Sequence, residues 1–248
     1  MTDPIAGLLD LADVRPALDA ARVAVDHAMR HPALRRQGGP VAAELGLRDA
    51  VASAALEGQA FDLEAVRTGA IADPIVHGAL RVSQALDGLT AQWPRAPRQV
   101  LARLHVLAAR DVVSADDLGR PNETAAASGR LDMLAALVAG GTTAPALLVA
   151  AVVHGELLAL GAFAGPNGLV ARGAARLALM SGGFDPRGLV AVDVGHLDRG
   201  PEYVGAAGAF ATGTPDGVRS WLKHYAAAVT VAAAQITIVG DELVSQPG

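Results

Sequence analysis

The chain has 248 residues, of which 52% are hydrophobic, 18% charged and 3% aromatic, and its formal net charge is −5. This composition excludes an intrinsically disordered chain, because such chains carry few apolar residues and many charges. The absence of cysteine also excludes a disulfide scaffold, a zinc ribbon and a cysteine nucleophile. Alanine is the most frequent residue, and it favours helix more than any other residue does. The composition therefore predicts an all-α protein with closely packed helices.

Charge and hydropathy bear on the partners and on the compartment. Lys223 is the only lysine and the arginines form no basic cluster, so we expect no nucleic-acid partner. Residues 1–13 are acidic and lack the positive start of a signal peptide. The longest apolar run, at 146–153, is much shorter than the roughly 20 residues of a membrane span. We expect a soluble, cytoplasmic protein without a membrane partner.

Apolar residues recur at helical spacing in a series of segments along the chain. Taken in order, they predict helices at 14–30, 41–58, 61–69, 75–91, 98–110, 130–139, 145–160, 169–180, 198–208 and 214–238. The segments 34–40 and 113–130 are rich in Gly, Pro, Asn or Ser and predict loops. Glu44 and Arg48 are four residues apart and are expected to pair on one helix face.

No strong shift in composition marks an internal boundary. We therefore expect one main helical domain at 40–238, preceded by an N-terminal helical extension at 1–39 and followed by a C-terminal tail at 239–248. The last residues of that tail, VSQPG, are expected to fray.

The most informative segment is 154–177, where the loop GAFAGPNG joins two predicted helices. The free backbone amides of the second helix would point into the loop and favour an anion, phosphate in particular. Arg172 lies about one turn into that helix, and Arg176 lies four residues further on the same face. The spacing predicts either an anion site or an ordinary corner between two helices with exposed arginines.

Residues 161–172 resemble the motif of Fic (Fido) domains, H-P-F-x-D/E-G-N-G-R-x-x-R. Phe163, Asn167, Gly168 and Arg172 match it. The resemblance covers roughly residues 40–235 and implies a Fic-like helical bundle with the motif loop between two central helices. Most active members of that family transfer AMP from ATP to a protein hydroxyl. By this resemblance Asn167, Gly168 and Arg172 would bind a nucleotide or another anion, and Phe163 would support the motif.

An upstream segment strengthens the resemblance. Residues 53–58, SAALEG, are similar to the inhibitory-helix pattern S/T-x-x-x-E-G/N of some Fic proteins. In those members the glutamate pairs with the last arginine of the motif and blocks the site of the γ-phosphate. Ser53 and Glu57 are four apart and share a helical face. The resemblance thus implies that Glu57 meets Arg172, as an inhibitory or a purely structural pair.

The chain departs from the family pattern at the positions that carry the chemistry. Gly161 stands where the family has its histidine base, whose loss costs about 10²–10⁴-fold in rate. Gly165 replaces the acid that coordinates magnesium, so we expect no metal ligand and doubt that Mg²⁺ binds. Pro166 lacks the amide of the usual glycine, and Leu169 replaces the first motif arginine.

Two histidines are candidates to replace the missing base. His154 lies about 10.5 Å along its helix from Gly161 and is expected to pack in the core. His196 belongs to a predicted loop, GHLDRG, and would have to approach the site in the fold. The segment 121–132, where the family has its target-binding hairpin, is rich in alanine, so we expect that hairpin to be short or absent.

Three functions remain open. The first is a degenerate Fic-domain protein, a pseudoenzyme without AMP transfer that retains ATP or another nucleotide as a ligand. The second is a non-catalytic helical interaction protein with a vestigial pocket, which would need a protein partner. The third is an active nucleotidyl- or phosphotransferase of altered mechanism. The sequence leaves the target and a homodimer open.

Overall fold

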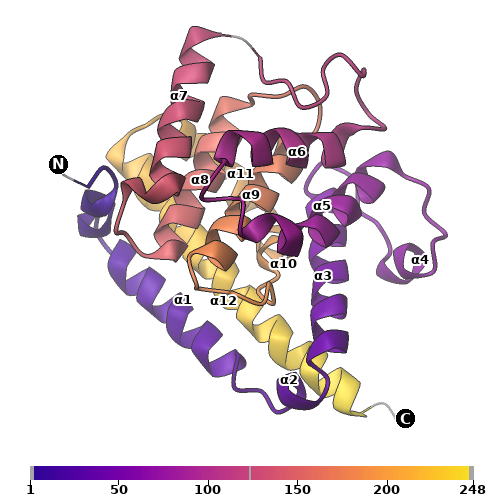
Figure 1. Ribbon diagram of the computed structural model, residues 1–248. Coiled ribbons are helices and arrows are strands. Elements are labelled where there is room, and N and C mark those ends of the chain that lie inside the picture. Colours follow the sequence, from indigo (N-terminus) through magenta and orange to yellow (C-terminus); the bar gives the residue numbers. More distant parts are fainter. Residues whose placement is uncertain (1–2, 123, 246–248) are drawn as a thin grey trace.

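Every regular element is helical in the computed structural model, which describes residues 3–122 and 124–245 (Figure 1). Within these ranges no strand forms, so the predicted all-α class is confirmed and no flap hairpin is present. The helices are α1 (Val14–Ala28), α2 (Ala33–Arg36), α3 (Gly38–Ala55), α4 (Leu63–Arg67), α5 (Pro74–Thr90), α6 (Pro97–Ala109), α7 (Ala125–Ala136), α8 (Ala146–Leu160), α9 (Asn167–Ser181), α10 (Val192–Asp198), α11 (Gly200–Ala211) and α12 (Pro215–Ser245). A 3₁₀ turn at Ala6–Asp10 precedes α1, and a π turn at Leu137–Gly141 follows α7.

The hairpin of α8 and α9 forms the centre of the bundle. Helix α9 is buried without interruption from Gly168 to Met180, and it packs against α3, α5, α6 and α8. A helix that is covered on all sides must be apolar or must pair its polar groups. Because α9 contains Arg172 and Arg176, its burial requires partners for two guanidinium groups.

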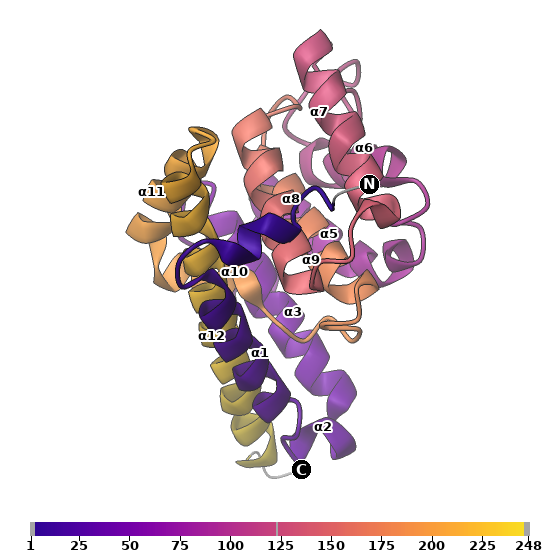
Figure 2. The same ribbon diagram turned by 90° about the vertical axis from the view of Figure 1, so that its left-hand side faces the viewer.

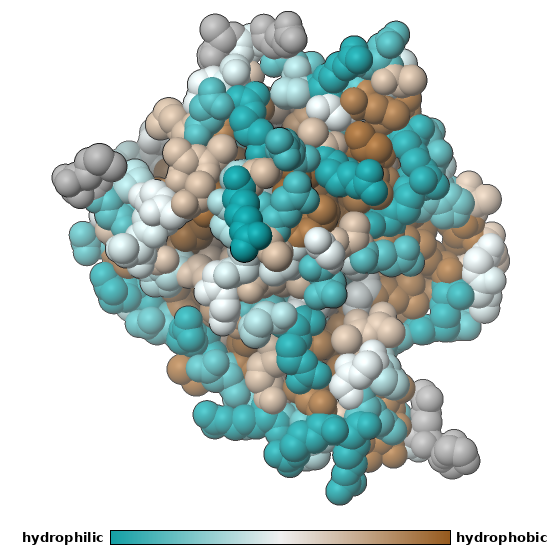
Figure 3. Space-filling view, in the orientation of Figure 1, coloured by the Kyte–Doolittle hydropathy of each residue, from teal (hydrophilic) through white to brown (hydrophobic). Residues whose placement is uncertain are grey.

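Helix α12 packs along α1 and reaches α3, α8, α10 and α11 (Figure 2). It is the one helix of the described residues that is long and apolar enough to cross a membrane by length and composition. One side of the helix, which includes Trp221, Tyr225, Val229, Ile236 and Val239, is buried against the bundle, whereas Ile238 on another side is 43% exposed. Figure 3 shows polar residues over most of one face, with apolar residues reaching the surface in patches between them.

Several segments differ from the prediction. Helix α3 ends at Ala55, so Glu57 lies in the turn after the helix and not on the helical face that it was expected to share with Ser53. Residues 38–40, expected in a loop, form the first turn of α3, where a proline is tolerated because first-turn amides have no acceptor within the helix. Helix α7 begins at Ala125, inside the expected loop 113–130, because the Thr124 side chain accepts from the Ala127 N–H at 3.1 Å and caps the helix. Helix α10 covers most of the GHLDRG segment that was expected to be a loop.

The expected tail also differs from the structure. Residues 239–245 continue α12, because Val239 is buried and Glu242 accepts from Arg48 at 2.5 Å. Arg48 also pairs with Glu44 at 2.7 Å, which confirms the expected pair on the face of α3. Residues 246–248 of the expected tail lie outside the described residues.

Small residues set the distance between helices. A Cβ atom on Gly78 of α5 would lie 2.2 Å from the carbonyl oxygen of Ala108 in α6, whereas one on Gly88 of the same helix would meet nothing within 4 Å. We therefore predict that Gly78→Ala lowers the free energy of unfolding by about 1–3 kcal/mol, since the two helices must separate.

The matched control is Gly88→Ala, which should be neutral or stabilise by up to about 1 kcal/mol through helix propensity. Urea denaturation of both variants tests the pair. Equal effects of the two substitutions would contradict the close crossing of α5 and α6.

Candidate functional site

The loop between α8 and α9 is held in one shape by Asn167. Helix α8 ends at Gly161, whose φ of 52° is the left-handed conformation typical of a helix C-terminus. The Asn167 carbonyl oxygen accepts from the Phe163 N–H at 2.9 Å. Its amide nitrogen donates to the carbonyl oxygens of Phe163 at 2.6 Å and Gly165 at 3.1 Å. Asn167 therefore acts here as a clamp of the loop.

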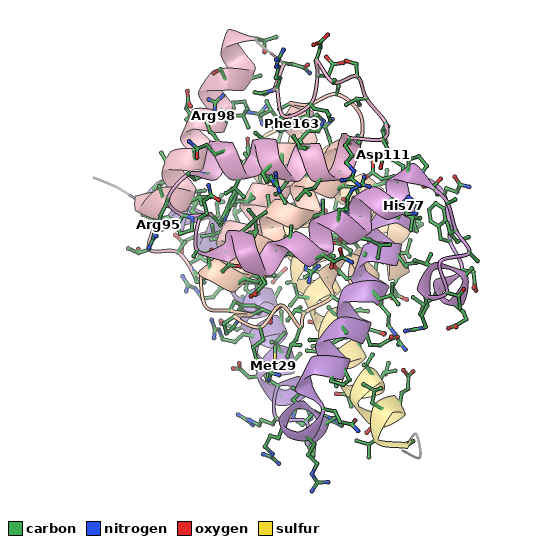
Figure 4. All side chains as sticks on the ribbon, turned by 45° about the vertical axis from the view of Figure 1, so that its right-hand side comes forward. Met29, His77, Arg95, Arg98, Asp111 and Phe163 are labelled. Atoms are coloured by element: carbon green, nitrogen blue, oxygen red, sulfur yellow. The ribbon has the colours of Figure 1, made fainter. Side chains whose placement is uncertain are left out.

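His105 of α6 fixes the same loop from outside. Its Nε2 donates to the Ala164 carbonyl oxygen at 2.8 Å, and its Nδ1 accepts from the Gly119 N–H at 2.9 Å. Its ring stacks on Phe163 with ring centroids 4.7 Å apart, and Figure 4 shows Phe163 beside α6. No local pattern predicts this role of His105, because its partners lie 14 and 59 residues away along the chain.

Arg172 is the most enclosed cation of the site, with 2% of its surface exposed. Its Nε donates to the Ser53 hydroxyl and its Nη2 to the Ser53 carbonyl oxygen, both at 2.8 Å. Nη1 donates to the Tyr203 hydroxyl at 3.2 Å, and Nη2 also donates to Glu57 Oε1 at 2.5 Å. The structure thus brings Ser53 and Glu57 to Arg172 across 115 residues or more of sequence.

Gly168 leaves the space that this pair occupies. A Cβ atom at this position would lie 2.1 Å from Glu57 Oε1 and 2.7 Å from Arg172 Nη1. The Glu57 carboxylate therefore lies at the start of α9, where the backbone amides and the helix dipole favour an anion. The anion-favouring position at this helix start is filled by the chain's own carboxylate.

A second buried ion pair lies one turn further along α9. Arg176 Nη1 lies 2.8 Å from Asp49 Oδ2, and Asp49 Oδ1 accepts from the Asp193 N–H at 2.9 Å. Asp193 Oδ2 is 3.6 Å from Arg172 Nε. Burial raises the pKa of Asp193 to about 7, and the neighbouring Asp49 carboxylate acts in the same direction. Burial also raises the pKa of Asp49, while the charge of Arg176 acts in the opposite direction.

The positions that depart from the Fic motif differ in their surroundings. A Cβ atom on Gly161 would meet nothing within 4 Å, so the position expected to carry a base is open. A Cβ atom on Gly165 would lie 2.8 Å from Cγ1 of Val113, in the segment after α6. An apolar side chain therefore lies where a metal-binding carboxylate would project. The site does not fit Mg²⁺, and the described residues contain no group of three side chains suited to a metal.

Neither candidate replacement for the base faces a substrate. His154 is 1% exposed, and its Nε2 lies 3.1 Å from the Tyr203 hydroxyl. His196 is fully buried in α10, and its Nδ1 lies 3.0 Å from His224 Nε2. Burial lowers the pKa of both His154 and His196 well below the usual value, so both are neutral. Because both rings are buried away from solvent, a bound target hydroxyl could not reach them to transfer its proton.

Comparison with known proteins identifies the fold. No protein-family model matches the chain, and neither does any curated protein. The structure of a Fic family protein from Desulfovibrio desulfuricans G20 matches with a TM-score of 0.72 and 18% identity over 94% of this chain and 76% of that chain. Fic-1 from C. elegans matches with a TM-score of 0.71 and 18% identity over 96% of this chain and 75% of that chain. The chain therefore has the fold of Fic proteins.

The bonds of His105 predict a dependence of stability on pH. Burial lowers the pKa of His105, and the neutral ring is the form that accepts from Gly119. In the unfolded chain a histidine binds a proton near pH 6.5, so below that pH the unfolded state binds more protons and stability falls. We expect the unfolding temperature to drop between pH 7.5 and 5, and to drop less steeply in His105→Gln.

The control for this measurement is His77→Gln. His77 is exposed on α5 (Figure 4), so its replacement should leave the slope against pH unchanged. Identical slopes for His105→Gln and the unsubstituted protein would contradict the role of the neutral ring.

Proposed function

We propose that this protein is a Fic-fold pseudoenzyme that transfers no AMP and whose anion site is closed by its own Glu57. The observation that carries the proposal is the state of the two positions where a base and a metal-binding acid would be needed. Gly161 provides no base, and Val113 covers Gly165, where a metal-binding acid would have to stand. These two differences act on the same transition state, so one substitution would not restore transfer.

The closed anion site supports the second half of the proposal. Arg172 is 2% exposed, and its N–H groups donate hydrogen bonds to Ser53, Tyr203 and Glu57. A nucleotide phosphate would have to displace the Glu57 carboxylate to reach the guanidinium and the start of α9. The Glu57 side chain is 20% exposed and follows the end of α3, so it can leave without unfolding a helix. We therefore expect a nucleotide to bind only after the Glu57 side chain has moved away from Arg172.

The compartment and the partners belong to the same proposal. The net charge of −5 and the lack of a basic cluster support a cytoplasmic protein that binds neither nucleic acid nor a membrane. A protein partner and a homodimer stay predictions, since no contact in the structure bears on them.

Release of Glu57 should open the site. We expect 5 mM ATP to leave the unfolding temperature of the unsubstituted protein unchanged and to raise that of Glu57→Gly by about 2–5 °C, because a ligand of the native state stabilises it. Glu57→Gly alone should lower the stability, since Arg172 loses its carboxylate partner. Thermal denaturation with and without ATP measures both effects.

The control is Glu64→Gly, which breaks an exposed pair with Arg67 at 3.0 Å. It should gain no response to ATP. If Glu57→Gly is destabilised and also shows no response, the pair is purely structural, and the protein is a helical interaction protein with a vestigial pocket.

Transfer activity is tested with labelled ATP and a cell lysate, beside an active Fic enzyme. We expect labelling by the unsubstituted protein at least about 10²-fold below that enzyme, because the base is missing. Gly161→His has room for its side chain, although it strains the left-handed backbone at this position, and it should stay inactive because Gly165 still provides no metal ligand. Labelling by the unsubstituted protein at the level of the active enzyme would overturn the pseudoenzyme proposal in favour of an altered mechanism.

A further inference from the structure

A cavity of about 390 Å³ lies apart from the motif loop, between α3, α5, α9 and the loop after α9. None of the motif residues lines it. Apolar walls come from Leu47 of α3, Leu80 and Leu86 of α5, and Met180 of α9. Its volume is within the range of about 300–1,000 Å³ that is typical of small-molecule sites. The cavity is therefore large enough for a small organic ligand.

The wall that α9 contributes carries a buried cation. Arg176 lines the cavity and is 7% exposed. Its one short contact is with Asp49 at 2.8 Å, while its bonds to Ser83 Oγ and the Gly188 carbonyl oxygen are long, at 3.4 and 3.3 Å. Its Nε–H makes no hydrogen bond with the described part of the chain. This nitrogen is not fully buried, so it stays accessible. The guanidinium, which has five N–H groups, thus keeps donors for a ligand.

A second guanidinium stands at the same edge. Arg187 precedes Gly188, lines the cavity and is exposed, and within residues 3–122 and 124–245 it forms no ion pair. Asp49 already offsets the charge of Arg176, so Arg187 supplies the cation that remains free. Asp87 of α5 is the one carboxylate of the lining, and it disfavours a ligand with two negative charges.

We propose that this cavity binds a small carboxylic acid with an apolar body. The carboxylate would lie between Arg187 and the free donors of Arg176, because a guanidinium matches a carboxylate in shape and charge. The apolar body would lie against Leu47, Leu80 and Met180. The single charge of a carboxylate suits the presence of Asp87 better than the double charge of a phosphate does.

The probe is 3-phenylpropionate, titrated calorimetrically into the full chain beside its neutral alcohol, 3-phenylpropanol. We expect a dissociation constant below about 1 mM for the acid, and binding at least about 10-fold weaker for the alcohol. Arg187→Gln should raise the dissociation constant of the acid by about 10-fold and leave that of the alcohol unchanged. The matched control Arg103→Gln removes an exposed arginine of α6 away from the cavity and should change neither.

A second variant tests the location without loss of a charge. A Cβ atom on Gly46 would lie 3.6 Å from Ser83 Oγ, which is ordinary contact, so Gly46→Leu extends a side chain into the cavity and also favours helix. Gly46→Leu should abolish binding of 3-phenylpropionate, and its unfolding temperature should equal or exceed that of the unsubstituted protein. Equal affinity for acid and alcohol, or undiminished binding in either Arg187→Gln or Gly46→Leu, would overturn the proposal.

Discussion

Arg172 is buried at the centre of the bundle, and its need for partners constrains how the neighbouring helices approach α9. The N–H groups of a guanidinium that is 2% exposed must find hydrogen-bond acceptors inside the protein, because burying an unpaired charge is strongly destabilising. The partners come from three different directions: Ser53 in α3, Asp193 in α10 and Tyr203 in α11. One side chain of α9 thereby fixes the approach of three other helices.

The same constraint gives Arg172 a structural role in the bundle, whatever chemistry the motif loop performs. Glu57 and Asp49 supply negative charge close to Arg172 and Arg176, and burial raises the pKa of Asp193 to about 7, which favours its neutral form more than in an ordinary aspartate. Loss of Arg176 would leave the Asp49 carboxylate buried without its partner, which is more costly than loss of an exposed pair. Loss of Glu57 would likewise leave the buried guanidinium of Arg172 without its nearest carboxylate, so Arg172 is tied to the stability of the bundle.

The sequence predicted the helices best and the long-range contacts of the site least. Helical spacing located α1, α5, α6 and α8 to within two residues, since each has a continuous apolar pattern. The contacts that Val113, His105 and Asp49 make with the site depend on how distant segments pack, and no local pattern encodes such a meeting. The missed start of α7 has a local cause, because the Thr124 cap lies among Pro, Asn and Ser residues that resemble a loop.

The two glycines that depart from the motif, Gly161 and Gly165, differ in physical terms. At Gly161 there is open space for a side chain, and the cost of a substitution comes from the left-handed backbone. At Gly165 the space is taken by Val113, so a carboxylate could return only if the segment after α6 moved away. That segment is tied down through Gly119 to His105, which also holds the motif loop at Ala164. The contacts that make the loop rigid are thus the ones that keep a metal-binding acid out of it.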